Sequence, residues 1–251
     1  MSDLRFEAVT VRYGVGRQTG PAVDQVDLTV PHRTIVGLVG ESGSGKSTLA
    51  RAAVGLVPLH SGRISLGDKP VPMHGRDRPL QMVFQDPSSS LDPRMMVGDV
   101  IAENISSRQS SSARETEVAR LLELVHLDAA RARSYPTQLS GGQRQRVALA
   151  RALAGQPKVI IADEITSNLD VSIQGAILNL VKELVEELDL TLLFISHNLA
   201  VVRYVASRIA VMQSAKIVEE GPTEQVLGSP KHAYTKQLLA AVPGEKVFTR
   251  T

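Results

Sequence analysis

Residues 40–47 constrain the chain more than any other segment. They read Gly-Glu-Ser-Gly-Ser-Gly-Lys-Ser, a full match to the pattern G-x4-G-K-[ST]. The apolar run Thr34–Val39 precedes the glycines, and we expect a helix to start near Lys46. Strand, glycine loop and helix is the order of a phosphate-binding loop. Lys46 is then predicted to reach the β- and γ-phosphates of a nucleotide, and Ser47 is predicted to ligate Mg²⁺. The alternative is a glycine-rich turn followed by an unrelated lysine.

Composition excludes several other classes of protein. A chain of 251 residues can bury a stable hydrophobic core without disulfide bonds or structural metal ions. The absence of cysteine excludes disulfides, thiolate metal sites and cysteine nucleophiles. The net charge of only +2 and the lack of Trp make a base-stacking surface improbable, so we expect no nucleic acid partner. No secretory leader is recognisable, and no apolar run approaches the ~18–20 residues that span a bilayer. We expect a soluble, cytoplasmic chain.

Strand and helix patterns alternate along most of the sequence. They predict an α/β fold with a mostly parallel sheet, preceded by an antiparallel β subdomain in the first thirty residues. We interpret residues 1–251 as a single domain with a catalytic core at about 1–87 and 156–228. A helical insertion is expected at about 88–155, and a C-terminal tail at about 229–251. Within the insertion, the polar stretch 106–113 is predicted to be a linker.

An acidic pair follows the short apolar strand Val159–Ala162. Parallel sheets bind ligands at the carboxyl ends of their strands, which predicts Asp163 near the glycine loop as a direct or water-mediated Mg²⁺ ligand. Glu164 is then predicted to act as the general base on the attacking water. Taken alone, the pair would more often be the N-cap of a helix.

The segment Leu139–Gln143 contains two adjacent glycines where a helix is expected to begin. Ser140 can cap that helix, and Gln143 can complete a capping box. Glycine costs about 1 kcal/mol relative to alanine within a helix, so capping alone does not explain the pair. A backbone that must approach an anion closely at a helix N-terminus does explain it.

Residues 139–146, Leu-Ser-Gly-Gly-Gln-Arg-Gln-Arg, resemble the signature sequence of ATP-binding-cassette ATPases, placed as in that family between the glycine loop and the acidic strand. The resemblance covers essentially the whole chain and implies an α/β P-loop NTPase fold with ATP and Mg²⁺ as cofactors. It implies that Gln85 lies near Mg²⁺ and the attacking water, and that residues Ser167 to Asp170 form a D-loop. It also implies that His197 contacts the γ-phosphate and that Tyr13 stacks on adenine. The predicted catalytic residues are Glu164, His197 and Gln85, and the metal ligands are Ser47, Gln85 and Asp163. The predicted nucleotide-binding residues are Tyr13, Gly40, Glu41, Ser42, Gly43, Ser44, Gly45, Lys46, Ser47, Thr48, Ser140, Gly141, Gly142, Gln143 and Asp170.

The same resemblance implies partners. A second ATPase chain, identical or different, would bring its own Ser140–Gly142 segment to the γ-phosphate, and a pair of membrane permease subunits would hold the chain peripherally at the inner face of the membrane. An extracytoplasmic solute-binding protein would take part indirectly. The loop Pro87–Met96, with Leu91 and Met95, is expected to contact the permease.

Two segments narrow the expected cargo. Residues 84–94 and 229–243 are similar to those of ATPases from oligopeptide, dipeptide and nickel importers, although Asn168 and Ala233 depart from the usual residues. The resemblance therefore implies import of peptides or a related small solute such as chelated nickel. An exporter or lipoprotein-type ATPase is the alternative within the family, and a DNA-repair ATPase is the alternative outside transport. A P-loop kinase would not explain Leu139–Gln143.

Overall fold

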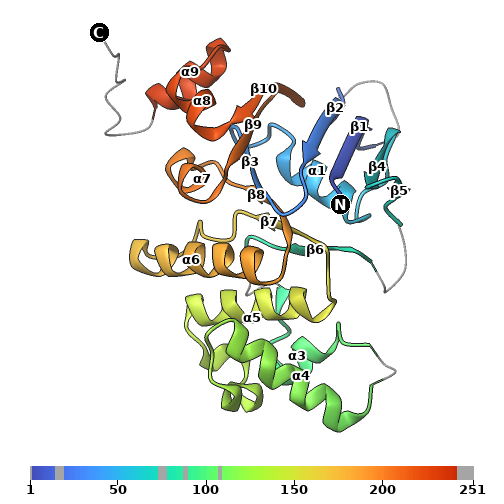
Figure 1. Ribbon diagram of the computed structural model, residues 1–251, viewed down its shortest axis with the longest axis vertical. Helices are drawn as coiled ribbons and strands as arrows, with labels where there is room; N and C mark the ends of the chain where they lie inside the picture. Colours follow the sequence, from blue (N-terminus) through green and yellow to red (C-terminus); the bar gives the residue numbers. More distant parts are fainter. Residues whose placement is uncertain (1, 15–19, 73–77, 87–89, 107–108, 242–251) are drawn as a thin grey trace. The chain divides into compact units, whose positions relative to one another are not determined.

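The computed structural model describes residues 2–14, 20–72, 78–86, 90–106 and 109–241. The chain packs into two compact units, the first formed by residues 1–73 with 191–251 and the second by residues 74–190. Figure 1 labels the helices and strands of both units. The predicted division into core and insertion near residues 88 and 155 stays a prediction.

The first unit contains an antiparallel sheet with the strand order β2-β1-β4-β5. Its strands are β1 (Leu4–Val11), β2 (Val23–Val30), β4 (Ser61–Leu66) and β5 (Lys69–Pro70). Apolar residues of β2 are buried while the polar residues between them are partly or fully exposed, as expected for a sheet with one covered face. The predicted antiparallel β subdomain is confirmed.

A second sheet of the first unit contains the strand that leads into the glycine loop. Here β3 (Ile35–Val39) lies between β8 (Thr191–Ile195) and β9 (Arg208–Gln213) and is parallel to both, and β10 (Lys216–Pro222) pairs antiparallel with β9. Every residue of β3 and β8 is buried, which their continuous apolar runs predict. The helices of this unit are α1 (Lys46–Ala53), α7 (Leu199–Val205), α8 (Thr223–Gly228) and α9 (Ala233–Ala240).

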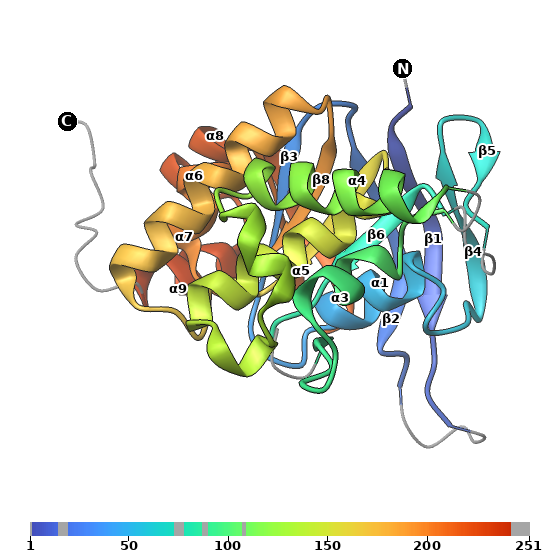
Figure 2. The same cartoon turned by 90° about the horizontal axis from the view of Figure 1, so that it is seen from below.

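The second unit combines a pair of parallel strands with a group of helices. Strands β6 (Leu80–Val83) and β7 (Val159–Asp163) are parallel, with Val83 opposite Ala162. The helices are α3 (Val97–Ala102), α4 (Ser111–Leu124), α5 (Gly141–Ala154) and α6 (Val171–Glu187), with the short 3-10 turns η1 (Ala129–Arg133) and η2 (Pro136–Gln138). Figures 1 and 2 show α3, α4 and α5 packed together. The predicted α/β class is confirmed, with parallel pairing of β3 with β8 and β9 and of β6 with β7.

The prediction of a linker over residues 106–113 is wrong at its C-terminal end. Helix α4 begins at Ser111, and the Ser110 hydroxyl accepts a hydrogen bond from Ala113 N at 3.3 Å. A serine-rich stretch is as suitable for a helix N-cap as for a linker, and the apolar residues that follow decide in favour of the helix. Residues 107–108, like residues 87–89 of the predicted loop 87–93, lie outside the described part of the chain.

Hydrophobic stretches in this fold serve the core. Among the residues that the structure describes, none of the helices has both the length and the apolar character needed to cross a bilayer.

Candidate nucleotide-binding site

The glycine loop in the first unit joins a buried strand to a helix, as predicted. It leaves β3 at Gly40 and ends at Gly45, the N-cap of α1, where the backbone is left-handed with φ 111°. A side chain at Gly45 is excluded, because its Cβ would lie 2.4 Å from the carbonyl oxygen of Ala22. No acidic residue stands in the first turn of α1, so the positive end of the helix dipole faces the loop uncompensated. This arrangement favours an anion.

Lys46 holds its positive charge inside this loop. Its ammonium donates hydrogen bonds to the carbonyl oxygens of Gly40 at 2.8 Å and Glu41 at 2.7 Å, and to the Ser44 hydroxyl at 3.3 Å. The side chain is 4% exposed. A buried ammonium surrounded by loop oxygens is fixed in place before a ligand arrives. The loop can therefore present a preset cation to a phosphate.

Three more predicted residues of the first unit lie around the loop. The Tyr13 hydroxyl donates to the Thr48 hydroxyl at 3.3 Å, while half of the Tyr13 surface stays exposed. Exposed His197 follows the end of β8, whose Ile195 stands opposite Leu38 of β3. Since β3 and β8 are parallel neighbours, His197 and the glycine loop lie at the same edge of this sheet. The first unit thus brings together Tyr13, Gly40, Glu41, Ser42, Gly43, Ser44, Gly45, Lys46, Ser47, Thr48 and His197.

The acidic pair of the second unit stands at the end of β7. Asp163 is the last strand residue and is buried, and Glu164 follows in a left-handed conformation with φ 50°. The Glu164 carbonyl accepts hydrogen bonds from the Ser167 N–H at 3.1 Å and from the Ser167 hydroxyl at 3.0 Å. A non-glycine residue with positive φ is uncommon, and such conformations concentrate at functional turns.

Gln85 belongs to the same cluster. It follows β6, the parallel neighbour of β7, and its side-chain amide donates to the Ser167 hydroxyl at 3.4 Å. The second unit therefore brings Gln85 to the turn that carries Glu164. The roles of Gln85, Asp163 and Glu164 stay predictions.

Ser140 and Gln143 form the capping box at the start of α5. The Ser140 hydroxyl accepts from Gln143 N at 3.3 Å, and the Gln143 side chain accepts from Ser140 N at 3.0 Å. The N-terminus of α5 is thus capped by residues of the same chain, and this capping does not explain why positions 141 and 142 are glycine.

The two glycines of α5 differ in their surroundings. A Cβ at Gly142 would lie only 2.6 Å from Cγ2 of Ile173 on α6, so close helix packing requires glycine there. A Cβ at Gly141 would meet Leu169 at 3.6 Å, an ordinary contact. Packing against Ile173 explains the glycine at position 142, whereas none of the described residues requires Gly141 to lack a side chain. Close approach of a ligand remains the predicted reason at Gly141.

Asp170 is exposed at the N-cap position of α6, and its side chain makes no capping hydrogen bond. The carboxylate is thus not committed to the helix that it begins. Together, the second unit carries the predicted site residues Gln85, Ser140, Gly141, Gly142, Gln143, Asp163, Glu164 and Asp170.

Sequence reasoning missed Tyr234, whose side chain contacts the glycine loop. The Tyr234 hydroxyl, on helix α9, accepts a hydrogen bond from Glu41 N at 2.8 Å. Nothing in a single sequence relates a tail residue to a loop 193 positions earlier. The only available signal was a tyrosine in a tail whose pattern resembles that of importer ATPases.

Comparisons with known proteins identify the family to which the chain is similar. The family model described as "ABC transporter" matches residues 23–167. The chain is 44% identical to the oligopeptide transport ATP-binding protein OppF of Bacillus subtilis, over 96% of this chain and 82% of that protein. It is 43% identical to OppF of Lactococcus lactis subsp. lactis, over 91% of this chain and 74% of that protein.

Solved structures show the same fold. The structure of cbiO1 from Clostridium perfringens, part of the ABC transporter complex cbiONQ, has a TM-score of 0.80 and 25% identity, covering 90% of each chain. The ATP-binding cassette MJ0796, a dimer in a post-hydrolysis state with ADP and Pi bound, has a TM-score of 0.74 and 28% identity, covering 88% of this chain and 98% of that one.

Proposed function

The chain belongs to the ABC transporter family, and we propose that it is the ATP-hydrolysing subunit of an importer that takes up peptides. The observation that carries the proposal is the buried Lys46 ammonium, preset by Gly40 and Glu41 within a glycine loop at a helix N-terminus. The printed names of the OppF relatives support peptides as the cargo. The nickel cargo suggested by sequence resemblance stays a prediction.

In this proposal the first unit binds the nucleotide. Backbone N–H groups of the glycine loop and the Lys46 ammonium bind the β- and γ-phosphates. Tyr13 offers an exposed ring for the adenine and is held at α1 through Thr48. His197, exposed at the end of β8, contacts the γ-phosphate.

The second unit supplies the group that activates water. Glu164 acts as general base, and its turn is held from one side by Gln85 through Ser167. Ser47, Gln85 and Asp163 offer hydroxyl, amide and carboxylate oxygens, the donor types that Mg²⁺ takes, so these residues fit the metal that the family implies. When bound, Mg²⁺ would neutralise phosphate charge. Lys46 and the glycine loop orient the nucleotide, and Glu164 accepts the proton of the attacking water.

A second ATPase chain completes the site. Gly141 presents backbone without a side chain at the N-terminus of α5, and the capping box satisfies Ser140 and Gln143 internally. We expect this helix end to close on the γ-phosphate bound by the partner chain. ATP then joins two chains, and hydrolysis releases them.

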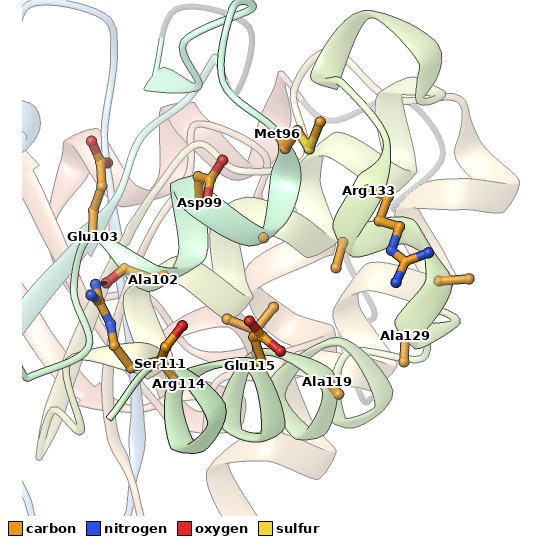
Figure 3. Close-up of a pocket in the computed structure, with 14 residues that line it drawn as sticks. Met96, Asp99, Ala102, Glu103, Ser111, Arg114, Glu115, Ala119, Ala129 and Arg133 are labelled. Carbon is orange, nitrogen blue, oxygen red and sulfur yellow. Dashed lines mark hydrogen bonds between the residues drawn. The ribbon is translucent and has the colours of Figure 1, made fainter. Parts of the chain in front are cut away.

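The membrane subunit is proposed to dock on the second unit, in a groove of about 880 Å³. Figure 3 shows α3 and α4 on opposite sides of this groove, with Arg133 of η1 at one end. Small alanine side chains leave room for a helix, and charged residues of both signs surround them. An amphipathic cytoplasmic helix of the permease fits such a groove. The groove is lined by Met96, Gly98, Asp99, Ala102, Glu103, Ser111, Arg114, Glu115, Val118, Ala119, Ala129, Ala130, Ala132 and Arg133.

The structure corrects which residues of the preceding loop can take part. Leu91 is 2% exposed, so it belongs to the core and cannot be the docking contact expected from the sequence. Met95 is half-buried and is not among the residues that line the groove, whereas Met96 is 40% exposed and lines it. The polar, Pro-rich surroundings of Leu91 concealed its inward orientation.

The docking proposal is tested with Met96→Glu, reconstituted with the permease subunits. The charge should abolish most substrate uptake while ATP binding by the isolated chain stays unchanged, because Met96 lies outside the nucleotide-binding residues. Arg94→Glu is the matched control, an exposed residue two positions away that does not line the groove. Full uptake by the Met96 variant would place docking elsewhere.

The proposed ATPase activity is tested with Lys46→Ala in the purified chain. Loss of a charge-assisted hydrogen bond should weaken ATP binding by roughly 10- to 100-fold and abolish hydrolysis. Arg51→Ala, which removes an exposed cation from the last turn of the same helix, should leave both unchanged. Circular dichroism checks the fold of both variants. Wild-type affinity in the Lys46 variant would refute the assignment.

A further inference from the structure

The C-terminal helix of the first unit reaches the glycine loop through one side chain. The Tyr234 hydroxyl on α9 accepts a hydrogen bond from Glu41 N at 2.8 Å, and Tyr234 is 4% exposed. Burial raises the pKa of the Tyr234 hydroxyl, although the hydrogen bond from Glu41 lowers it in part. The hydroxyl is therefore protonated at neutral pH and serves as a neutral acceptor for the loop N–H.

The peptide group that Tyr234 contacts also holds Lys46. The N–H of Glu41 and the C=O of Gly40 belong to one planar peptide, in which they point in opposite directions. Tyr234 accepts from the N–H, while the Lys46 ammonium donates to the C=O at 2.8 Å. Fixing one end of this plane fixes the direction of the other. Tyr234 thereby orients the carbonyl that positions the Lys46 ammonium.

Tyr234 is itself fixed to strand β10, in the sheet of the first unit that contains β3. The Glu219 carboxylate on β10 accepts hydrogen bonds from Lys231 N at 2.8 Å and His232 N at 3.0 Å, immediately before α9. The His232 side chain caps α9 by accepting from Tyr234 N at 3.2 Å. These contacts leave little freedom to the start of α9. The tyrosine is thus a rigid support between β10 and the loop.

We propose that Tyr234 is a positioning residue for nucleotide binding, and that the tail segment 229–241 sets the affinity of the glycine loop through it. The inference rests on the proposed function, since it assigns a preset shape to the loop that binds ATP. Without the hydroxyl, the Gly40–Glu41 peptide can rotate, and the loop must be reordered each time a phosphate binds. The effect is on the phosphate site, and the adenine contact at Tyr13 is untouched.

Tyr234→Phe tests the proposal, because it removes the hydroxyl and keeps the buried ring. Loss of one hydrogen bond should weaken ATP binding about 2- to 12-fold. Pyrophosphate, which has no base, should lose the same factor. The nuclear magnetic resonance signal of the Glu41 amide proton should move upfield in the nucleotide-free protein, since its acceptor is gone. Tyr204→Phe, which removes the same atom from a half-exposed tyrosine on α7, is the matched control and should change none of these.

The outcomes separate this inference from the proposed function. If the wild-type chain binds ATP and pyrophosphate and Tyr234→Phe binds both equally well, the tyrosine is only a structural anchor and the inference is wrong, whatever happens to the melting temperature. Weaker binding of ATP with unchanged binding of pyrophosphate also overturns it, because the effect would then lie at the base. If the wild-type chain binds no nucleotide, the proposed function fails and takes this inference with it.

Discussion

Alanine at Gly142 should destabilise the protein, although alanine is the better helix former. Its Cβ would stand 2.6 Å from Cγ2 of Ile173, about 1 Å inside an ordinary contact, so α5 and α6 must shift. Overpacking of this kind costs about 1–3 kcal/mol, and the gain in helix propensity offsets about 1 kcal/mol of it. We expect a net loss of about 0–2 kcal/mol in the free energy of unfolding.

Gly141→Ala is the matched control for that experiment. The new Cβ meets Leu169 at 3.6 Å, so stability should stay unchanged or rise by up to about 1 kcal/mol. Both variants gain the same helix propensity, so the difference between them is the overpacking cost of about 1–3 kcal/mol. This corresponds to about 2–12 °C in the thermal midpoint of a chain of this size. The Gly141 variant should nevertheless lose ATP hydrolysis, since its side chain stands where the partner's γ-phosphate is proposed to bind.

Thermal melts followed by circular dichroism, with ATPase assays in parallel, measure both effects. Ile173→Ala removes the methyl group that the new Cβ would strike, and the Gly142→Ala change should cost less in that background. Equal midpoints for the Gly141 and Gly142 variants, or no rescue by Ile173→Ala, would refute the packing argument. Full hydrolysis by the Gly141 variant would refute the ligand argument.

Two further predictions concern the first unit. Tyr13→Ala should weaken ATP binding roughly 10-fold and leave pyrophosphate binding unchanged, because a stacked aromatic ring contributes about 1–3 kcal/mol. Tyr13→Phe keeps the ring and should bind ATP normally. Nucleotide titration compares both variants with the wild type, and normal ATP affinity in the alanine variant would remove Tyr13 from the site. Partial burial raises the pKa of Glu219, but hydrogen bonds, led by that from Lys231 N, outweigh it and leave the pKa below its ordinary value. The ionised Glu219 therefore stabilises the fold above about pH 4.3, and this stabilisation is lost as the pH falls below that value. Below about pH 5, the melting temperature of Glu219→Gln should depend less steeply on pH than that of the wild type. Equal pH dependence of the two melting temperatures would contradict this.

The glycine loop shows how far sequence reasoning reached. Residues 40–47 have a local pattern whose chemistry requires strand, loop and helix, and the structure has β3, the loop and α1 in that order. The capping box at Ser140 and Gln143 was also predictable, since both partners lie within four positions of each other. Local hydrogen bonds and hydrophobic periodicity are encoded in neighbouring residues, so one sequence is enough to predict them.

Features that depend on distant residues could not be predicted. The packing of Gly142 against Ile173 depends on how α5 crosses α6, and the bond from Glu41 N to Tyr234 joins residues 193 positions apart. Leu91 was misjudged for the same reason, because its 2% exposure results from tertiary packing, which its neighbours in sequence do not encode. The left-handed backbone of Glu164 is likewise set by the turn to Ser167, not by the identity of a glutamate.

The rate of ATP hydrolysis by Glu164→Gln tests the central claim most directly. The substitution keeps the size of the side chain and removes its basicity, so a general base would be lost without disturbing the turn. We expect ATP binding to be retained, turnover to fall by roughly 10²- to 10⁴-fold, and the variant to accumulate as an ATP-bound dimer. Turnover close to that of the wild type would contradict the account.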